Sequence, residues 1–250
     1  MHALVDLDIL CYEMGSARDP DTKAPLKWPL VRARVEERIE NILNAVEASS
    51  WQGYLTGEGN FRDALGTILP YKGTRDRSER PFWYSGVYHY LRDNRGAIVV
   101  HGMEADDAIS IEHTLDGDST IICTRDKDLR MVPGWHYTWP SFNQEEREPF
   151  YIGEIDGLRN FYSQLLTGDR SDNILGLYNV GPKSACVQRV QEFETELDMF
   201  REVKEQYRLR FGSYWDMFMC ENGRLLWLKR TEDDDWYHRQ KELERVVTDS

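Results

Sequence analysis

The sequence of 250 residues is 40% hydrophobic and 12% aromatic, which is enough to bury one sizeable core or one core plus a small second domain and excludes a disordered tail protein. No apolar run approaches the roughly 18 residues that a membrane span needs. The start, MHALVDLDIL, is interrupted by Asp6 and Asp8 where a secretory signal would remain apolar. We therefore expect a soluble, cytoplasmic protein with no membrane partner.

The net charge of −13 argues against a nucleic-acid partner when it is taken as a single number. The charges are unevenly distributed, however. The segment 62–95 carries seven basic and four acidic residues, whereas the segment 101–128 carries eight acidic and two basic ones. Such a dense acidic segment repels itself unless cations join it. The four cysteines form no C-x-x-C pair, so neither a zinc site nor a disulfide framework is indicated.

Short apolar runs alternate with helical patterns through the first half of the chain. The runs predict buried strands at Ala3–Leu10, Gly53–Thr56, Ala97–His101 and Thr120–Thr124, and apolar residues at spacings of three and four predict helices at Leu30–Ala48 and Ala105–His113. This alternation predicts an α/β fold with a mostly parallel central sheet and helices on both faces.

Beyond about Asn160 the strand pattern fades, and the remainder predicts helices broken by glycine-containing turns at Leu175–Gly181 and Glu221–Gly223. The segment Met217–Leu228 has Asn222 and Gly223 between apolar runs, which favours a β-hairpin. We expect two domains, an α/β domain over residues 1–164 and a helical one over residues 165–250.

Acidic residues follow the predicted strands almost every time. In an open parallel sheet, ligands bind at the carboxyl ends of the strands, so these acids are the first candidates for chemistry. They form four groups: Asp6; Glu104, Asp106 and Asp107; Asp126 and Asp128; and Asp169 and Asp172. A single acid at a helix start is commonly an N-cap, but four groups converging on one edge would repel one another without cations. Oxygen ligands alone favour Mg²⁺ or Mn²⁺, and a site for two Mg²⁺ suits phosphodiester hydrolysis.

The spacing of these acids carries further expectations. If the backbone stays extended after Thr124, Asp126 and Asp128 point the same way and are able to share a metal. Glu104 and Asp107 share one side of a helix, while Asp106 lies about 200° around from Glu104 unless Glu104 precedes the first turn.

Five segments, read together, resemble the 5′ nuclease superfamily of flap endonucleases and 5′ to 3′ exonucleases, and the length is most similar to the compact phage exonucleases. They are LVDLDIL (4–10), NFR with PYKGTR (60–62 and 70–75), GMEADDAI (102–109), TRDKDLRMVPG (124–134) and LLTGDRSDNILGLYNVGPKSA (165–185). The resemblance implies a PIN-like nuclease core with a helical arch and a C-terminal helix-turn-helix (H3TH) subdomain. It also implies the host cytoplasm as the location if the protein is phage-encoded.

The resemblance implies that the carboxylates divide between two Mg²⁺ positions, which Mn²⁺ is also able to fill. The implied ligands are Asp6, Glu104, Asp106, Asp107, Asp126, Asp128, Asp169 and Asp172. Family members often carry another aspartate at the end of the second strand, where this chain has Thr56 or Gly57; Glu58 is a candidate substitute. Asp8 is placed at no ligand position by the family, and we expect a structural role for it.

Basic residues and a glycine-containing turn predict the DNA contacts. By resemblance, Lys72 and Arg75 hold the scissile phosphate in or under the arch and act in catalysis together with Asp126. Further DNA contacts are expected from Arg77, Arg80, Gly176, Gly181, Lys183 and Arg189. Tyr71 is a further candidate for DNA binding, which either stacks on a base or packs. Pro182 is expected to open a helix whose amides grip a phosphate, with K⁺ as an implied ion. The aromatic run Phe82, Trp83, Tyr84, Tyr88 and Tyr90 is expected to pack rather than to stack on bases.

The predicted function is metal-dependent 5′ to 3′ exonuclease or flap endonuclease activity on DNA ends, flaps and junctions, specific for structure rather than sequence. RNA–DNA hybrids and replication proteins are further expected partners of a monomeric enzyme. Two alternatives stay open at this point: a PIN-type ribonuclease, against which the segment 165–185 argues, and a non-catalytic binder of branched DNA, which would lack the carboxylates.

Overall fold

The structure is a computed structural model that describes residues 1–76, 80–141 and 147–248. The chain divides into two compact units. The first comprises Met1–Gly59, Asp76–Leu129 and Gly134–Ile152; the second comprises Asn60–Arg75, Arg130–Pro133 and Gly153–Ser250. The predicted division at residue 164 falls inside helix α6 (Glu154–Thr167).

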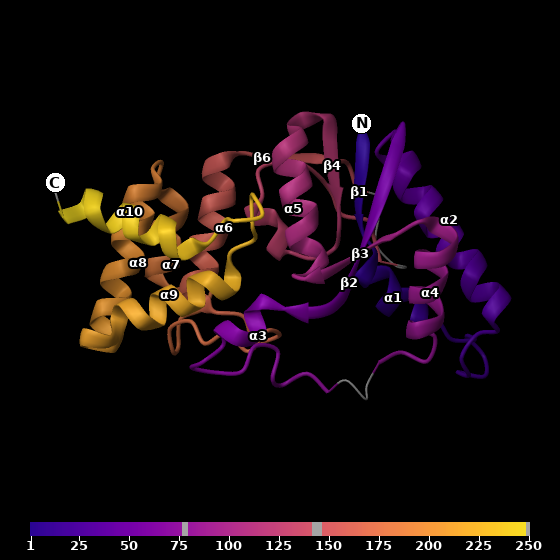
Figure 1. Ribbon diagram of the computed structural model, residues 1–250, viewed down its shortest axis with the longest axis horizontal. Coiled ribbons are helices and arrows are strands. Elements are labelled where there is room, and N and C mark those ends of the chain that lie inside the picture. Colours follow the sequence, from indigo (N-terminus) through magenta and orange to yellow (C-terminus); the bar gives the residue numbers. More distant parts are fainter. Residues whose placement is uncertain (77–79, 142–146, 249–250) are drawn as a thin grey trace. The chain divides into compact units, whose positions relative to one another are not determined.

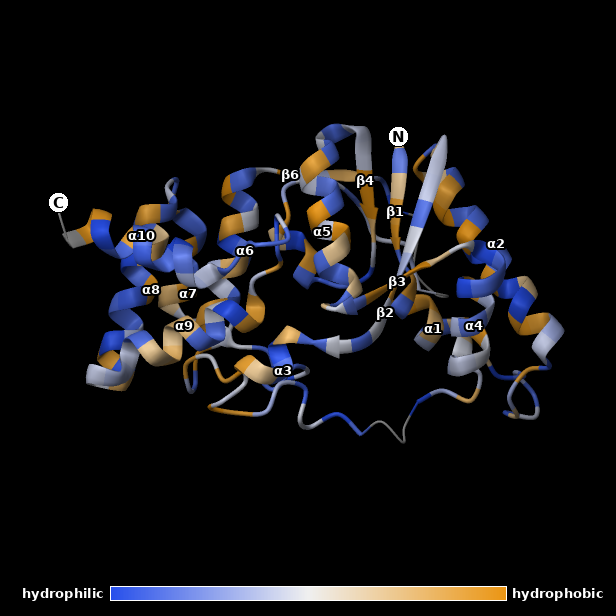
Figure 2. Cartoon of the chain, in the orientation of Figure 1, coloured by the Kyte–Doolittle hydropathy of each residue, from blue (hydrophilic) through white to orange (hydrophobic). Residues whose placement is uncertain are grey.

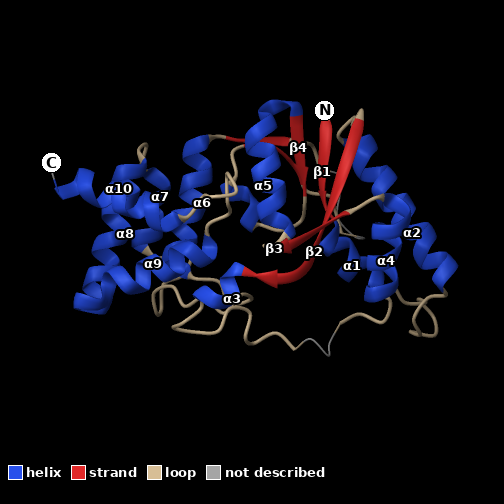
Figure 3. Ribbon diagram, in the orientation of Figure 1, coloured by secondary structure: helices blue, strands red, loops and turns tan. Residues whose placement is uncertain are grey.

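The first unit is built on a six-stranded sheet flanked by helices (Figures 1 and 3). Its strands, in spatial order, are β3 (Ile98–Gly102), β2 (Ser50–Asn60), β1 (His2–Asp6), β4 (Thr120–Cys123), β5 (Gly134–Tyr137) and β6 (Phe150–Ile152). Strand β1 pairs in parallel with β2 and β4, β4 pairs in parallel with β5, and β6 joins β5 antiparallel. The predicted mostly parallel sheet is confirmed.

Helices cover both faces of this sheet because the central strands are apolar on both sides. Ala3 and Val5 belong to a core cluster with α1 (Leu7–Gly15), α2 (Trp28–Ala45) and α4 (Tyr84–Arg95). Helix α5 (Ala105–Asp116) contacts β1 and β4, and Figure 1 shows it on the opposite side of the sheet from these three helices. The predicted helices at 30–48 and 105–113 correspond to α2 and α5.

The first predicted strand is too long. Strand β1 stops at Asp6, whose side chain accepts a hydrogen bond from the backbone N–H of Asp8 at 3.1 Å and so caps α1. Residues 7–10 are therefore helical. Over a run of only a few residues, the sequence pattern of a buried strand cannot be distinguished from that of a buried helix.

The aromatic run around α4 packs largely as expected. Tyr84 is buried, Trp83 donates its indole N–H to the carbonyl of Leu26, and Tyr88 and Tyr90 lie against the core cluster. Phe82 is the exception, since it is 67% exposed. Between Gly66 and Trp83 the described residues form bends and turns and no helix, so the helical arch is not seen in this part of the chain.

The second unit is helical. Its helices are α3 (Phe61–Leu65), α6, α7 (Ala185–Glu192), α8 (Glu196–Phe211), α9 (Trp215–Leu226) and α10 (Trp236–Thr248). Figure 2 shows hydrophobic and hydrophilic residues alternating along these helices, as amphipathic helices require. Phe161, Tyr162, Trp227 and Trp236 pack ring against ring in its core.

The predicted hairpin at 217–228 is wrong, because most of this segment is helix α9. Gly223 lies within that helix and not in a turn. A glycine is required there because a Cβ would come within 2.1 Å of the Trp236 indole. Asn222 is buried and donates to the hydroxyl of Tyr207 at 2.9 Å. Tertiary packing, and not turn geometry, accounts for both residues.

The loop from α6 to α7 folds back on itself and gives the C-terminal part the helix–loop–helix arrangement expected of an H3TH-like subdomain. Gly168 and Gly176 both have positive φ, and a Cβ at Gly176 would lie 2.2 Å from the backbone nitrogen of Gly168. The N–H of Leu177 donates to the carbonyl of Leu166 at 2.8 Å. Helix α7 starts at Ala185 with Ser184 as N-cap, three residues later than the predicted start at Pro182.

Candidate functional site

Asp6 and Asp126 are held together by Thr124 at the carboxyl ends of β1 and β4. The Thr124 hydroxyl donates to Asp6 Oδ2 at 2.8 Å and accepts from the backbone N–H of Asp126 at 2.9 Å. Asp6 is only 2% exposed. The pKa of Asp6 is raised to about 7, first by burial and then by the charges of Asp8 and Asp126, against the lowering effect of the Thr124 hydrogen bond.

Asp8 adds a carboxylate from the first turn of α1. Both of its oxygens accept the backbone N–H of Thr56 at 3.2 Å. Thr56 in turn accepts, through its hydroxyl, the N–H of Ala105 at 2.9 Å. These contacts connect the start of α1 with β2 and with the start of α5, so the predicted structural role of Asp8 has a geometric basis.

The acids at the start of α5 form a capping box. Glu104 is the N-cap residue, and its backbone N–H donates to Asp107 Oδ2 at 3.2 Å. Asp107 is fully buried, whereas Asp106 is half-buried in the first turn. Because Glu104 precedes the helix, the helical angle that would separate it from Asp106 does not apply.

The backbone does not stay extended after Thr124, so the condition under which Asp126 and Asp128 would point the same way is not met. Asp128 opens a 3₁₀ turn (Asp128–Met131), and its backbone N–H donates to Asp126 Oδ1 at 2.9 Å. Lys127 lies 3.4 Å from Asp128 Oδ1. The chain turns because the Asp126 side chain caps the next residues, a local contact that competes with extension.

At the end of β2, Glu58 is exposed and its backbone N–H donates to His101 Nδ1 at 3.1 Å. A role for Glu58 in place of an aspartate stays a prediction. Thr56 and Thr124 are functional candidates that the sequence analysis did not single out. Thr124 directly follows β4, and a hydroxyl residue in that place is the signal that would have identified it. Thr56 lies within β2, where it has no such signal.

In the second unit, Asp169 organises its own loop. Its Oδ1 accepts from Ser171 N at 2.7 Å, Ser171 Oγ at 2.6 Å and Asp172 N at 3.2 Å, and Gln164 donates to its Oδ2 at 3.3 Å. These contacts fix the backbone that carries Asp172.

Asp172 is the centre of a basic cluster that includes the two predicted catalytic cations. Arg75 donates to Asp172 Oδ1 at 2.5 Å, and Lys72 Nζ lies 3.7 Å from Asp172 Oδ2. The buried Tyr71 donates its hydroxyl to Asp172 Oδ2 at 2.8 Å, and Lys72 N–H donates to the Asp172 carbonyl at 2.8 Å. Lys72 has a φ of +52°. The structure thus brings Tyr71, Lys72 and Arg75 together around one carboxylate.

The remaining predicted DNA contacts have varied surroundings. Arg80 lies over the ring of Tyr84 at 4.6 Å, and Arg77 lies outside the described residues. Arg189 is paired with Glu202 at 2.5 Å, whereas Lys183 is exposed. A side chain at Gly181 would meet open space.

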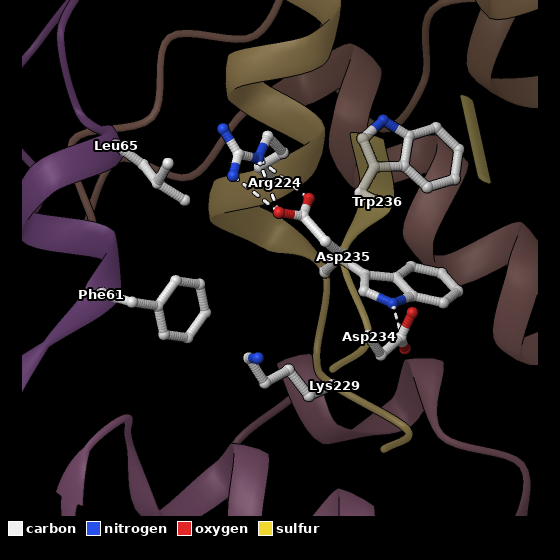
Figure 4. Close-up of a pocket in the computed structure, with 8 residues that line it drawn as sticks. Phe61, Leu65, Arg224, Lys229, Asp234, Asp235 and Trp236 are labelled. Carbon is white, nitrogen blue, oxygen red and sulfur yellow. Dashed lines mark hydrogen bonds and ion pairs between the residues drawn. The ribbon is translucent and has the colours of Figure 1, made fainter. Parts of the chain in front are cut away.

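A pocket of about 230 Å³ lies in the second unit, and none of the residues that line it is a predicted site residue. Figure 4 shows Phe61 and Leu65 on one side and the C-terminal segment on the other. Its charged groups already have partners: Arg224 pairs with Asp235 at 2.6 Å, and Asp234 accepts the Trp227 indole N–H at 2.8 Å.

The donor chemistry of the first unit fits a divalent cation. Among residues 1–76, 80–141 and 147–248, no three His, Cys, Asp or Glu side chains form a ready ligand set. Asp6 nevertheless lies buried with two further carboxylates close enough to raise its pKa. Oxygen donors of this kind suit Mg²⁺ or Mn²⁺, and a bound cation would offset their repulsion.

The fold is that of known nucleases. No protein-family model and no curated protein matches the chain. Among solved structures, a flap endonuclease of bacteriophage T5, in a pseudo-enzyme–product complex with DNA and metal ions, is 15% identical with a TM-score of 0.63, over 99% of this chain and 100% of that one. The T5 5′-exonuclease with bound zinc is 16% identical with a TM-score of 0.61, over 98% and 99%.

A third structure, the catalytic core of Rad2 in complex with DNA substrate, is 18% identical with a TM-score of 0.50, and the match covers 99% of this chain and 72% of that one. At these identities the likeness is one of fold. The fold implied by the resemblance to the 5′ nuclease superfamily is therefore confirmed. No helix of the described residues is long and apolar enough to cross a membrane.

Proposed function

We propose that the protein is a divalent-metal-dependent nuclease that hydrolyses DNA phosphodiesters at or near 5′ ends. The observation that carries the proposal is the Asp6–Thr124–Asp126 group at the carboxyl edge of a parallel sheet, with Asp8 beside it. The T5 proteins of the same fold are a flap endonuclease and a 5′-exonuclease, which supports this reaction class.

In this proposal eight carboxylates divide between two Mg²⁺ positions, which Mn²⁺ is also able to fill: Asp6, Glu104, Asp106, Asp107, Asp126, Asp128, Asp169 and Asp172. When bound, the metal supplies Lewis acidity and a water of lowered pKa. Thr124 orients Asp6, and Asp126 N–H is fixed by the same hydroxyl.

The cations of the second unit are proposed to bind phosphate. Lys72 and Arg75 are held by Asp172, so they are preorganised as a pair before substrate arrives. Arginine and lysine placed in this way neutralise phosphate charge, which makes binding depend on salt and not on base sequence. The proposal extends to flaps and RNA–DNA hybrids as substrates, to K⁺ at the loop before α7, and to a monomeric cytoplasmic enzyme that works beside replication proteins.

The first test is product release from 5′-labelled duplex and flapped DNA in Mg²⁺ or in EDTA. We expect Mg²⁺-dependent cleavage that falls at least about 100-fold in Asp126→Asn, because a lost metal ligand removes several kcal/mol of transition-state stabilisation. Asp118→Asn, which changes an exposed acid in the same unit, is the matched control and should cut normally. Product lengths separate mononucleotide trimming from flap removal.

Two outcomes would contradict the proposal. Binding of branched DNA without cleavage in either Mg²⁺ or Mn²⁺ favours a non-catalytic DNA-binding protein. Cleavage of single-stranded RNA in preference to DNA favours a PIN-type ribonuclease.

Thr124 is expected to position the carboxylate of Asp6 and the backbone of Asp126. Thr124→Val keeps the side-chain shape but removes both hydrogen bonds, so metal affinity and cleavage should fall about 10-fold or more, while Thr124→Ser, which retains the hydroxyl, should stay near wild type. Mn²⁺ titration and cleavage rates measure both effects. Unchanged Mn²⁺ affinity in Thr124→Val would show that Thr124 does not position the metal ligands.

A further inference from the structure

The loop between α6 and α7 presents an aromatic side chain to solvent on an ordered turn. Tyr178 is 69% exposed, although the preceding residue, Leu177, is buried. The N–H of Val180 donates to the carbonyl of Leu177 at 3.1 Å, which closes a turn. Tyr178 and Asn179 are the central residues of this turn, and Asn179 has a φ of +62°, which asparagine tolerates. The backbone is therefore fixed in a form that leaves the Tyr178 ring outside the core.

A cation from α8 lies over this ring. The guanidinium carbon of Arg210, in the last turn of α8, is 5.3 Å from the centroid of the Tyr178 ring, which is within the range of a cation–π contact. In the part of the chain that the structure describes, no carboxylate forms an ion pair with Arg210. A positive charge is thus held beside an exposed aromatic ring and is not neutralised by an acid.

The two segments that carry this pair are basic and apolar, although the whole chain has a net charge of −13. Segment 170–191 has Asp172 as its only acid, and that residue is buried, while segment 206–215 has no acid. Such a surface attracts phosphate and offers apolar area to bases. Besides Tyr178 and Arg210, these segments expose two cations and three large apolar side chains: Arg170, Lys183, Leu175, Leu209 and Tyr214.

An exposed aromatic ring of this kind fits an unpaired nucleotide better than a base pair. In a duplex the faces of the bases are stacked on one another, so a protein meets phosphates, sugars and the base edges in the grooves. A single strand exposes the faces of its bases, which stack on aromatic side chains while cations meet the phosphates. The Tyr178 ring and the Arg210 guanidinium supply these two kinds of contact side by side.

We infer that Tyr178 and Arg210 bind an unpaired nucleotide of single-stranded DNA, with the base stacked on the Tyr178 ring and the adjoining phosphate on the Arg210 guanidinium. The inference rests on the proposed function for DNA as the partner. It adds a base contact to the phosphate contacts proposed for this loop, and it adds two residues that the sequence analysis did not single out. Stacking of this kind tolerates any base, so the contact distinguishes unpaired from paired DNA and not one sequence from another.

The test is the affinity of the full-length protein for DNA in EDTA, measured by fluorescence anisotropy with a labelled single strand of about 12 nucleotides and a duplex of the same length. Tyr178→Ala should weaken single-strand binding at least about fivefold more than it weakens duplex binding. Tyr178→Trp, which keeps an aromatic face, should retain the wild-type preference. Arg210→Gln should weaken single-strand binding and reduce the slope of log affinity against log salt by about 0.7.

The matched control is Tyr237→Ala on α10. Tyr237 is another exposed tyrosine of the second unit, with the Lys241 ammonium 5.8 Å from its ring centroid. Lys241, however, is paired with Asp216 and Glu244, so this pair offers phosphate no free charge. The variant should leave both DNA affinities unchanged.

Equal losses of single-strand and duplex affinity in Tyr178→Ala would overturn the inference, because the ring would then not select unpaired DNA. Unchanged single-strand affinity would also overturn it and would leave this surface to a protein partner. If the wild type cuts 5′-labelled DNA in Mg²⁺, the proposed nuclease stands in either case. A selective loss of single-strand affinity, in a protein that cuts no DNA in Mg²⁺ or Mn²⁺, would support this inference and contradict the proposed function.

Discussion

Replacing Asp6 with asparagine is expected to abolish DNA cleavage and, at the same time, to raise the melting temperature of the metal-free protein. Asparagine has nearly the same shape and is as good an N-cap for α1. It removes a buried negative charge that lies beside two other carboxylates. A lost metal ligand lowers the cleavage rate on the order of 1000-fold if it removes about 4 kcal/mol of transition-state stabilisation.

The gain in stability depends on pH in a defined direction. The pKa of Asp6 is 3.8 for the ordinary side chain and about 7 in the folded protein, so between these values the native state binds more protons than the unfolded state. Stability of the metal-free protein therefore falls as the pH rises from about 4 to about 7. Each unit of pKa difference is worth about 1.4 kcal/mol, which bounds the full effect at about 4 kcal/mol.

Thermal unfolding in EDTA at about pH 5 and about pH 8 measures this effect. The wild type should lose several degrees between the two conditions, as a change of a few kcal/mol implies for a chain of this size, and Asp6→Asn should lose less. Added Mn²⁺ should restore the wild type at the higher pH and leave the variant unchanged. If Asp6→Asn is less stable than the wild type at about pH 8, the negative charge of Asp6 does not destabilise the metal-free protein, and the assignment of Asp6 as a metal ligand is contradicted.

Strand ends and their acids were predictable from the sequence because both signals are local. The apolar runs at 97–101 and 120–124 are short and bounded by polar residues, and they became β3 and β4. The acids that follow them are therefore near the carboxyl edge of the sheet. The link between Asp6 and Asp126 was not predictable, because it depends on a hydrogen bond from the hydroxyl of Thr124 to Asp6, 118 positions earlier in the sequence.

Sequence reasoning failed where a tertiary contact overrides a local preference. Asn222 and Gly223 are a turn signal in isolation, yet the pair lies in α9, where Gly223 leaves room for Trp236. The capping of α1 by Asp6 likewise ended the first strand four residues before its apolar run ends. The sequence predicted Asp172 as a metal-binding carboxylate. Its contacts with Lys72 and Arg75, about 100 residues earlier, have no signature in the sequence.

Removal of the Arg62 guanidinium is expected to give a large loss of stability in the second unit. Arg62 is 1% exposed, and it donates from Nε to the carbonyl of Leu225 at 2.9 Å and from Nη2 to the carbonyl of Trp227 at 2.8 Å. Its guanidinium also lies over the ring of Phe61 at 4.5 Å. The last carbonyls of a helix have no partner within it, so these bonds cap the end of α9 with a cation, which the helix dipole favours.

Arg62→Met leaves two buried carbonyls without this donor and should lower the free energy of unfolding by about 2–4 kcal/mol. Urea unfolding followed by tryptophan fluorescence measures the change, since Trp227 and Trp236 lie in the same core. Arg208→Met, at an exposed side chain on α8, is the matched control and should stay within about 0.5 kcal/mol of the wild type.

The same variant links stability to function, because Arg62 lies in the segment Asn60–Arg75 of the second unit, which also carries Lys72 and Arg75. If Arg62 anchors this segment to the end of α9, Arg62→Met should weaken the binding of DNA in EDTA at temperatures well below its own unfolding transition. Its Mn²⁺ affinity should remain that of the wild type, since Asp6 and Asp126 belong to the first unit. Normal DNA affinity in a destabilised Arg62→Met protein would show instead that Arg75, Lys72 and Asp172 keep their arrangement without the anchor.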